Sequence, residues 1–494
     1  MTGVPVGERD DIEMLAKGGR ANVAGFFIRL IARIPFLVAA AQWYGAAQMG
    51  RLAYAVVIVE FAALLATLGL KRGLAKHLTG DGKANGAWDG VLVVLAATLI
   101  PTLVLMLIPQ IMFPNSPIKP LDYLLPLTIP AVAISDITLA ALAFRGDVGA
   151  TVRARAVVEP WVISVAAVAL WKWVPSDGLL VAYALSMAAA LIASLIPFLK
   201  AFGLPENWTP RAVELFALAR HNVPLAAADA IEWGSRRIDV VILGLFVSPA
   251  TVGIYWVAQQ VASLPQKLKT SFDPVLGPAI ARKLEERDTV GIARQVSQVG
   301  FWIIAAQTGV ALALGIPGES LMSLIGPGRD FVGGNGALAF LLLAEVAAAV
   351  AVVSEAALVY MARMRNLLIS LASIVTQIAL TFAFIIGARQ MDYPELYQAA
   401  APALALAITL GISSLVKAWL AAHVLGAPVS VWRWALPVAG AVAILIGQFA
   451  IRLPEWAELS LGVPAILLGY SWVIWRLGFG EDDRILFRSQ RSTE

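Results

Sequence analysis

The sequence predicts an all-α polytopic membrane protein with about fourteen transmembrane helices. Three observations support this fold class. Of the 494 residues, 59% are hydrophobic and only 14% are charged, whereas soluble domains average about 25% charged residues. The mean hydropathy is +0.78. The apolar residues also form runs of about 20 residues, the length that an α-helix needs to cross a bilayer.

Fourteen segments qualify as spans, and the prolines within many of them are compatible with membrane helices. No soluble domain is expected, because the longest inner connections, Lys71–Asp89 and Ala201–Arg220, are only about 20 residues long. The sequence contains no GxxxxGK[ST] phosphate loop, which excludes ATP hydrolysis by this chain. The expected spans are 23–45, 52–70, 90–113, 122–144, 156–174, 178–199, 221–246, 252–278, 295–316, 334–361, 366–387, 396–422, 432–451 and 459–477.

The distribution of basic residues predicts a topology with both termini in the cytoplasm. Lys and Arg collect in the cytoplasmic loops of membrane proteins. With the N-terminus inside, the fourteen spans place most of the 37 Lys and Arg residues in inner connections. The first 22 residues lack the pattern of a signal peptide, so the first apolar segment is expected to remain as a span. The basic residues expected outside are Arg51, Lys119, Lys172, Arg329, Arg389 and Arg452.

The stretch Ala228–Gln260 combines five ionisable residues with an apolar run. All of them except Arg237 fall within about 80° of one another on a helix. Because a charge at the bilayer centre costs about 2.5–3.5 kcal/mol, such a stripe is expected to face a polar cavity. The five residues are Asp229, Glu232, Arg236, Arg237 and Asp239.

A weak internal repeat relates this stretch to the beginning of the chain. In both places a charged apolar helix leads through a short turn into a helix of small and aromatic residues. Repeated halves around a site at the membrane midplane are a known transporter plan. A shift of 203 positions aligns Arg33 with Arg236, Gly50 with Gly253, and Ala55 with Ala258.

Several segments resemble the polysaccharide-transport branch of the multidrug/oligosaccharidyl-lipid/polysaccharide flippase superfamily. They are residues 42–78, which include GLKRGL, residues 236–268, residues 272–288 (FDPVLGPAIARKLEERD) and residues 321–331 (LMSLIGPGRDF). The most telling pattern is the run Ile238, Asp239, Gly244, Val252, Gly253, Tyr255 and Ala258, followed by the exit near Pro274.

The resemblance implies two pseudo-symmetric six-helix lobes in a V-shape, alternating access, and a polyprenyl-pyrophosphate-linked sugar as substrate. The corresponding division is a cytoplasmic tail (1–22), an N-lobe (23–202), a C-lobe (203–423), a C-terminal helix pair (424–478) and a second cytoplasmic tail (479–494). Expected partners are the lipid-linked oligosaccharide, membrane lipids, and candidate polymerase and glycosyltransferase proteins, but no nucleic acid.

The candidate residues for binding the pyrophosphate are Arg29, Arg33, Arg236 and Arg237. Arg29 and Arg33 lie one turn apart and point the same way on a helix. Guanidinium groups bind phosphate oxygens in a bidentate manner, which suits a pyrophosphate. The alternative is that Arg29 and Arg33 extend to lipid headgroups at the inner membrane face.

The candidate residues for a coupling cation, Na⁺ or H⁺, are acidic residues within spans. Glu232, Arg236 and Asp239 are spaced to neutralise one another, which is the structural alternative. Glu345 and Glu355 have no basic residue within one turn, and an unpaired buried carboxylate can bind a proton. Alternatively, they pair with Lys417 or line water. The full set is Asp229, Glu232, Asp239, Glu345 and Glu355, and the same two interpretations apply to Glu60, Asp136 and Glu159.

The sequence favours a flippase over an enzyme, since no catalytic dyad or metal cluster stands out and no cofactor is expected. The expected function is ATP-independent transfer of an undecaprenyl-pyrophosphate-linked oligosaccharide across the bacterial inner membrane. One alternative is a cation-coupled multidrug exporter of the same fold, which arginines in the first helix disfavour. The other is a non-transporting membrane scaffold for glycosyltransferases.

The topology can be tested by labelling single cysteines, because the chain has none of its own. A cysteine within Arg282–Arg294 should resist a membrane-impermeant reagent added from outside, whereas one within Pro317–Val332 should react. Labelling of the first position from outside would contradict the predicted orientation.

Overall fold

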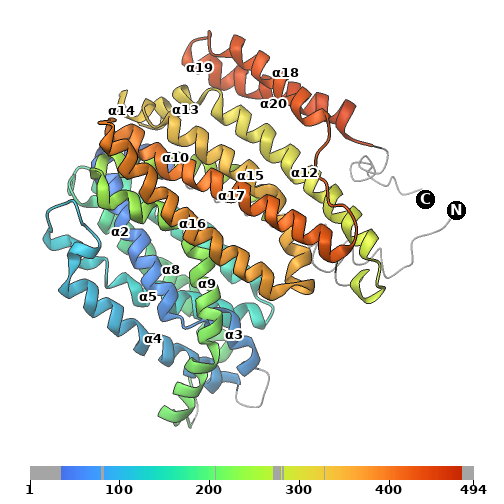
Figure 1. Cartoon of the computed structure of the whole chain (residues 1–494). Helices are drawn as coiled ribbons and strands as arrows, with labels where there is room; N and C mark the ends of the chain where they lie inside the picture. The colour runs from blue at the N-terminus through green and yellow to red at the C-terminus, as the bar shows by residue number, and fades with distance from the viewer. Residues whose placement is uncertain are drawn as a thin grey trace, which may run out of the picture. The chain divides into compact units, whose positions relative to one another are not determined.

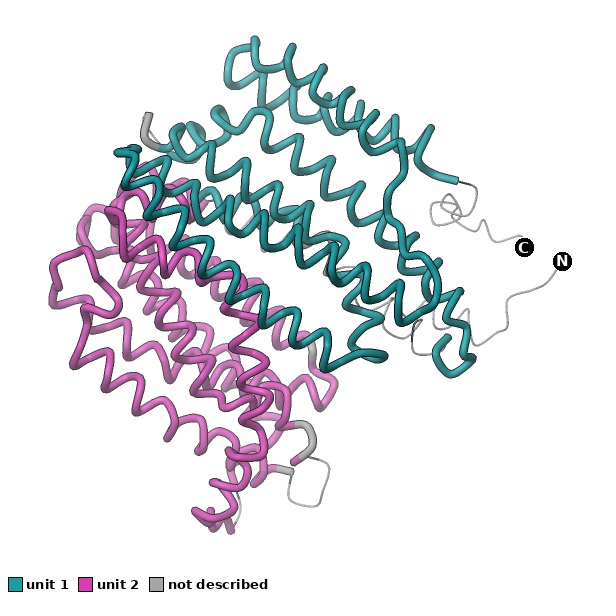
Figure 2. Tube along the Cα trace, in the orientation of Figure 1, with its two compact units in different colours: residues 1–22, 257–494 teal, residues 23–256 magenta. Residues whose placement is uncertain are grey.

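The computed structural model describes residues 35–78, 83–205, 207–270, 280, 283–326 and 329–480. These residues form α-helices with short 3-10 and π-helical turns, and no strand occurs among them. The all-α prediction is therefore confirmed. The chain divides into two compact units, residues 23–256 (the N-terminal unit) and residues 257–494 together with 1–22 (the C-terminal unit; Figure 2).

In the N-terminal unit, α8 packs against both α5 and α7, and α2 packs against α4, α5 and α9 (Figure 1). Helix α10 (Pro249–Thr270) begins in this unit and continues into the other. Apart from α10, the elements of this unit, including those just named, are η1 (Ala40–Tyr44), α2 (Gly45–Ala66), α3 (Leu70–Gly73), η2 (Leu74–Leu78), α4 (Lys83–Leu107), η3 (Pro109–Ile111), η4 (Pro120–Leu124), α5 (Thr128–Phe144), α6 (Val148–Thr151), η5 (Val152–Val158), α7 (Glu159–Leu170), α8 (Gly178–Phe202) and α9 (Ala212–Phe246).

In the C-terminal unit, α17 packs against α15 and α16, and α12 packs against α15. Helices α18 and α20 pack against each other and against α12. The elements are α12 (Thr289–Gly315), α13 (Gly318–Ile325), α14 (Arg329–Val332), α15 (Asn335–Met361), α16 (Arg363–Gln390), α17 (Glu395–Leu425), α18 (Ala435–Ala450), α19 (Glu455–Ala457), η6 (Glu458–Gly462), α20 (Val463–Val473) and η7 (Ile474–Gly478).

Each predicted span coincides with helix over the described residues, and the division expected near residues 172–178 falls between α7 and α8. By length and composition, nine helices of the described chain can cross a membrane, so the protein is a multi-pass membrane protein. The number fourteen stays a prediction. Helix α18 is shorter, and α9 has 35 residues and several charges. At 1.5 Å per residue α9 is about 52 Å long, well beyond a hydrocarbon core of about 30 Å.

The N-terminal unit extends past the predicted end of the N-lobe at residue 202. It includes α9 and the beginning of α10, which the sequence assigned to the C-lobe. The reason is physical contact, because α9 packs along α2, α3 and α4. A division by contacts between helices therefore differs from a division into two sets of six helices. The two six-helix lobes remain a prediction.

Two glycines allow α2 and α10 to approach each other at backbone distance. A Cβ atom added to Gly50 would lie 1.7 Å from the carbonyl oxygen of Pro249, and one added to Gly253 would lie 2.1 Å from the carbonyl oxygen of Ala46. No other residue fits at such a separation. Gly50 and Gly253 are the pair that the 203-residue shift aligns, so the two repeats touch at equivalent positions.

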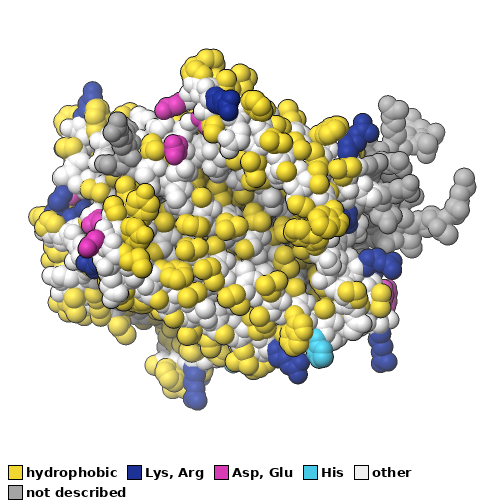
Figure 3. Space-filling view, turned by 45° about the horizontal axis from the view of Figure 1, so that its top comes forward, with side chains coloured by type: hydrophobic (Ala, Val, Ile, Leu, Met, Phe, Trp, Pro, Cys, Tyr) yellow, Lys and Arg dark blue, Asp and Glu magenta, His cyan; other side chains and the backbone are white. Residues whose placement is uncertain are grey.

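Apolar side chains cover much of the surface, as expected where lipid is the solvent. Figure 3 shows a face whose middle carries mainly hydrophobic side chains and whose Lys and Arg residues lie toward the margins. On α4, for example, Leu99, Ile100, Leu103 and Leu107 are all more than half exposed. In water such a stripe would favour aggregation or a partner protein. In a bilayer it faces acyl chains at no cost.

Candidate functional site

The described part of the candidate site is the charged face of α9 and its partners in the N-terminal unit. Arg29 and Arg33 lie outside the described residues, so their positions stay predictions. Asp229, which is 6% exposed, and Glu232 both bind Arg72 of α3. The Nε of Arg72 lies 2.7 Å from Asp229 Oδ1, and its Nη2 lies 2.7 Å from Glu232 Oε2. One guanidinium therefore serves two carboxylates from the same helix face.

The GLKRGL segment explains how Arg72 reaches α9. Gly69 adopts φ 75°, a left-handed conformation that favours glycine, and it lets α3 begin directly after α2. A Cβ atom on Gly69 would lie 2.5 Å from the carbonyl oxygen of Asn222, and one on Gly73 would lie 1.7 Å from Asn222 Oδ1. Both glycines thus press α3 against α9. From the sequence alone, Arg72 is expected only to lie in the inner connection Lys71–Asp89.

The two arginines of α9 differ in their surroundings. Arg236 is exposed. Arg237 is half-buried, its Nη1 lies 3.7 Å from Glu60 Oε2, and its guanidinium lies over the Trp233 ring at 5.9 Å. The Trp233 ring stacks in turn on Phe61 of α2 at 5.1 Å. This face of α9 therefore presents guanidinium groups beside an aromatic pair.

Asp239 ends the charged stripe and is completely buried. Its Oδ2 accepts a hydrogen bond of 2.5 Å from the hydroxyl of Tyr255, and its Oδ1 accepts one from the Val240 N–H. Tyr255 is also fully buried. The pairing accounts for the joint presence of Asp239 and Tyr255 in the resemblance pattern, since an unsatisfied buried carboxylate would be costly.

A second charged network lies inside the N-terminal unit. Asp136 of α5 binds both Lys71, at 3.1 Å, and Arg155, at 2.5 Å. Arg155 also binds Glu159 one turn along the chain, at 2.8 Å. Asp136 and Glu159 were weighed as cation sites, and here each has a basic partner. The role of Arg155 was missed, because its position near the end of a span gave it the appearance of a loop cation.

The acidic candidates of the C-terminal unit lie on α15. Glu355 Oε2 lies 3.0 Å from the Nζ of Lys417 on α17, so the alternative that it pairs with Lys417 holds. Glu345 is half-buried almost three turns earlier on the same helix.

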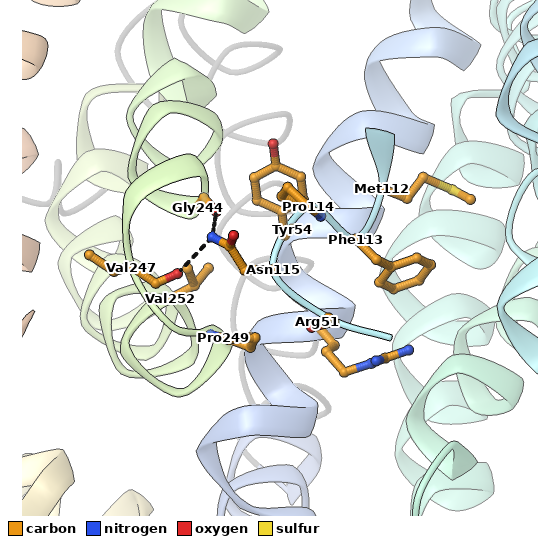
Figure 4. Close-up of a pocket in the computed structure, with 12 residues that line it drawn as sticks. Arg51, Tyr54, Met112, Phe113, Pro114, Asn115, Gly244, Val247, Pro249 and Val252 are labelled. Carbon is orange, nitrogen blue, oxygen red and sulfur yellow. Dashed lines mark hydrogen bonds between the residues drawn. The ribbon is translucent and has the colours of Figure 1, made fainter. Parts of the chain in front are cut away.

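A small cavity lies in the N-terminal unit where α2 meets the connection between α9 and α10 (Figure 4). Asn115 closes it by donating hydrogen bonds to the carbonyl oxygens of Gly244 and Val247. Its volume of about 20 Å³ holds one water molecule and no sugar. At its edge the Nη2 of Arg51 donates to both carboxylate oxygens of the fully buried Asp122 at 2.9 Å, so this region is a structural seam.

The α3–α9 ion pairs make a prediction about stability. Arg72→Met removes the cation from the buried Asp229 carboxylate and should lower the free energy of unfolding by about 1–3 kcal/mol. Glu232→Gln is the matched control. Because the Glu232 side chain is 58% exposed, its loss should cost less than about 1 kcal/mol. Unfolding by SDS in mixed micelles measures both, and equal losses would contradict the distinction.

Comparison with known proteins gives the family and the fold. The profile of the family described as polysaccharide biosynthesis protein matches residues 16–283. The lipid II flippase MurJ in an inward closed conformation matches with a TM-score of 0.72 and 12% identity, over 92% of this chain and 98% of MurJ.

Transporters of the multidrug resistance MATE family, from the MOP superfamily, also match. The inward-facing structure has a TM-score of 0.62 and 13% identity, over 81% of this chain and 94% of the transporter. The outward-facing structure has a TM-score of 0.54 and 12% identity, over 83% of this chain and 95% of the transporter. The comparison with curated sequences gave no match. Since the family profile covers more than half of the chain, and the fold is that of MOP superfamily flippases and transporters, the protein belongs to the polysaccharide biosynthesis protein family.

Proposed function

We propose that this protein is a flippase that moves an undecaprenyl-pyrophosphate-linked oligosaccharide across the bacterial inner membrane. It works by alternating access without ATP hydrolysis, with both termini in the cytoplasm. The observation that carries the proposal is the pair of adjacent guanidinium groups on α9, those of Arg236 and Arg237. Glycosyltransferases and a polymerase would act before and after it on the same lipid-linked substrate.

The geometry at Arg237 supports binding of a phosphate group. Its 3.7 Å separation from Glu60 is longer than a hydrogen bond, so the two charges attract without locking together. A phosphate oxygen can displace such a partner and accept two parallel N–H bonds from the guanidinium. The preceding residue, Arg236, is exposed. Arg29 and Arg33 of the first span would complete the anion site.

The aromatic pair Phe61 and Trp233 lies beside this anion site. Trp233 is one turn from Arg237 on α9, and both rings sit within the N-terminal unit. Apolar ring faces pack against the C–H faces of sugars, in the way that large aromatic side chains contribute contact area in binding sites. A pyrophosphate at Arg236 and Arg237 would place the first sugar within reach of these rings.

Multidrug export is the second candidate, since the MATE transporters named above share the fold. Its substrates in this interpretation are cations, which the guanidinium groups of α9 would repel. The family match to polysaccharide biosynthesis favours the lipid-linked glycan instead. A non-transporting scaffold would have no use for arginines on a membrane helix, whose insertion is costly.

For coupling to Na⁺ or H⁺ we propose Asp239 and Glu345 as the binding residues. Both carboxylates lie within long helices of the protein, Asp239 in α9 and Glu345 in α15, and acidic residues inside membrane helices often mark ion pathways. Asp239 is buried against the neutral hydroxyl of Tyr255. A bound cation would stabilise one conformation and so drive the cycle.

The pyrophosphate site predicts that lysine replaces arginine poorly. Arg33→Lys and Arg236→Lys keep the charge but lose the planar fork. Losing one charged hydrogen bond of about 1.5–3 kcal/mol corresponds to about a tenfold to hundredfold drop in glycan export. Export is measured by complementation with variants shown to be inserted. Arg211→Lys, on the highly exposed Arg211, is the control and should export normally.

Two outcomes would count against this site. Full export by both lysine variants would mean that charge alone suffices, as expected for residues that only reach lipid headgroups. Full export by Arg33→Ala and Arg236→Ala would remove these positions from the site.

The coupling proposal predicts that Asp239→Asn and Glu345→Gln each abolish export while the purified variants still bind the lipid-linked substrate. Neutralising the carboxylate removes the charge that holds the cation, but leaves the arginines intact. Glu319→Gln, on the exposed end of α13, should export normally. Normal export by both test variants would refute the assignment.

A further inference from the structure

The ammonium group of Lys417 lies deep inside the C-terminal unit. The residue is 5% exposed, on a helix whose neighbours are α15 and α16. Its Nζ donates to Glu355 Oε2 of α15 at 3.0 Å and to Ser370 Oγ of α16 at 3.1 Å. Three helices therefore direct one cation and two oxygen atoms toward the same point.

Asn366 lies beside this position, although its carbonyl oxygen forms no hydrogen bond with Lys417. It lies one turn before Ser370 on α16, is 6% exposed, and donates its amide to the other oxygen of Glu355 at 3.3 Å. Its own Oδ1 is buried and has no hydrogen-bond partner among the described residues. A buried oxygen atom that accepts no hydrogen bond costs free energy, and a carbonyl oxygen of this kind can coordinate a cation.

The oxygen atoms around Lys417 are those that bind small hard cations in proteins. A carboxylate, a hydroxyl and an amide carbonyl favour such ions by charge and by dipole. A lysine ammonium is itself a compact point charge. Here it is attached to α17 by its own side chain, so it cannot leave during a transport cycle.

We propose that the Lys417 ammonium is a tethered cation that fills a monovalent-cation site formed by Glu355 and Ser370, with the carbonyl oxygen of Asn366 beside it. Removal of the lysine side chain turns this position into a binding site for free Na⁺ or K⁺. In the natural protein the lysine ammonium therefore neutralises the Glu355 carboxylate, and no free ion binds there. The site is independent of the proposed anion site, since all its residues belong to the C-terminal unit.

The test compares melting temperatures of the detergent-purified protein in NaCl, KCl and choline chloride at equal concentration. Lys417→Ala should melt about 2–4 °C higher in NaCl or KCl than in choline chloride, with a rise that saturates, because a ligand that binds only the folded state stabilises it. The natural protein should show no such rise in KCl, and any rise in NaCl that comes from a Na⁺ coupling site is shared by every variant and is subtracted. The rise should disappear in the double variant Lys417→Ala/Glu355→Gln.

Lys119→Ala is the matched control. It removes another lysine that binds a carboxylate, Asp177 at 2.9 Å, but one whose side chain is 28% exposed. It should melt equally in the three salts. Recovery of folded Lys417→Ala only in NaCl or KCl would also support the site, because a bound cation would then replace the charge that pairs with Glu355.

Three results would overturn the proposal. The first is a folded Lys417→Ala variant with the same melting temperature in all three salts. The second is a KCl-dependent rise of similar size in the natural protein, the double variant or the Lys119→Ala control. The third is failure of Lys417→Ala to fold in every salt, because the vacated position would then bind no cation.

Discussion

Pairing of charges in an apolar interior is the constraint on which this structure depends. A carboxylate or guanidinium taken out of water loses several kcal/mol of solvation, so each buried charge needs a partner at hydrogen-bond distance. Arg72 meets this need for Asp229, Arg155 for Asp136, and Glu355 for Lys417. The Arg72 and Lys417 pairs join helices that are distant in sequence, and the Arg155 pair joins two segments that are close in sequence. The polar residues therefore fix which helices pack together, while the apolar residues only keep them in the membrane.

The same constraint connects the fold to the proposed transport. Close, buried pairs such as Arg51 with Asp122, at 2.9 Å, hold a seam closed, whereas the looser contact of Arg237 with Glu60, at 3.7 Å, leaves a guanidinium available to a ligand. The distinction is one of distance and exposure, because both pairs consist of the same chemical groups. A transporter needs both kinds, one to keep its helices together and one to exchange its partner.

The helices were predictable from sequence, but most of the pairs were not. Apolar runs of about 20 residues identify a span directly, which is why the segment 366–387 coincides with α16. The stripe on α9 was also visible, since helical spacing is local. Its partner Arg72 is more than 150 positions away, and nothing in the composition of GLKRGL indicates Asp229. Lys417 was one of two alternatives for Glu355, and only the packing of α15 on α17 decides between them.

The contact between Gly50 and Pro249, and its counterpart at Gly253, has a consequence for how this sequence can change over time. The spacing of α2 and α10 is set there by main-chain atoms, which substitution elsewhere does not alter. Lipid-facing positions such as Leu99 or Ile100 are therefore free to drift among apolar residues without disturbing the gap between the helices. Related chains can diverge widely on their surfaces while their helices still superimpose, provided that these two positions remain glycine.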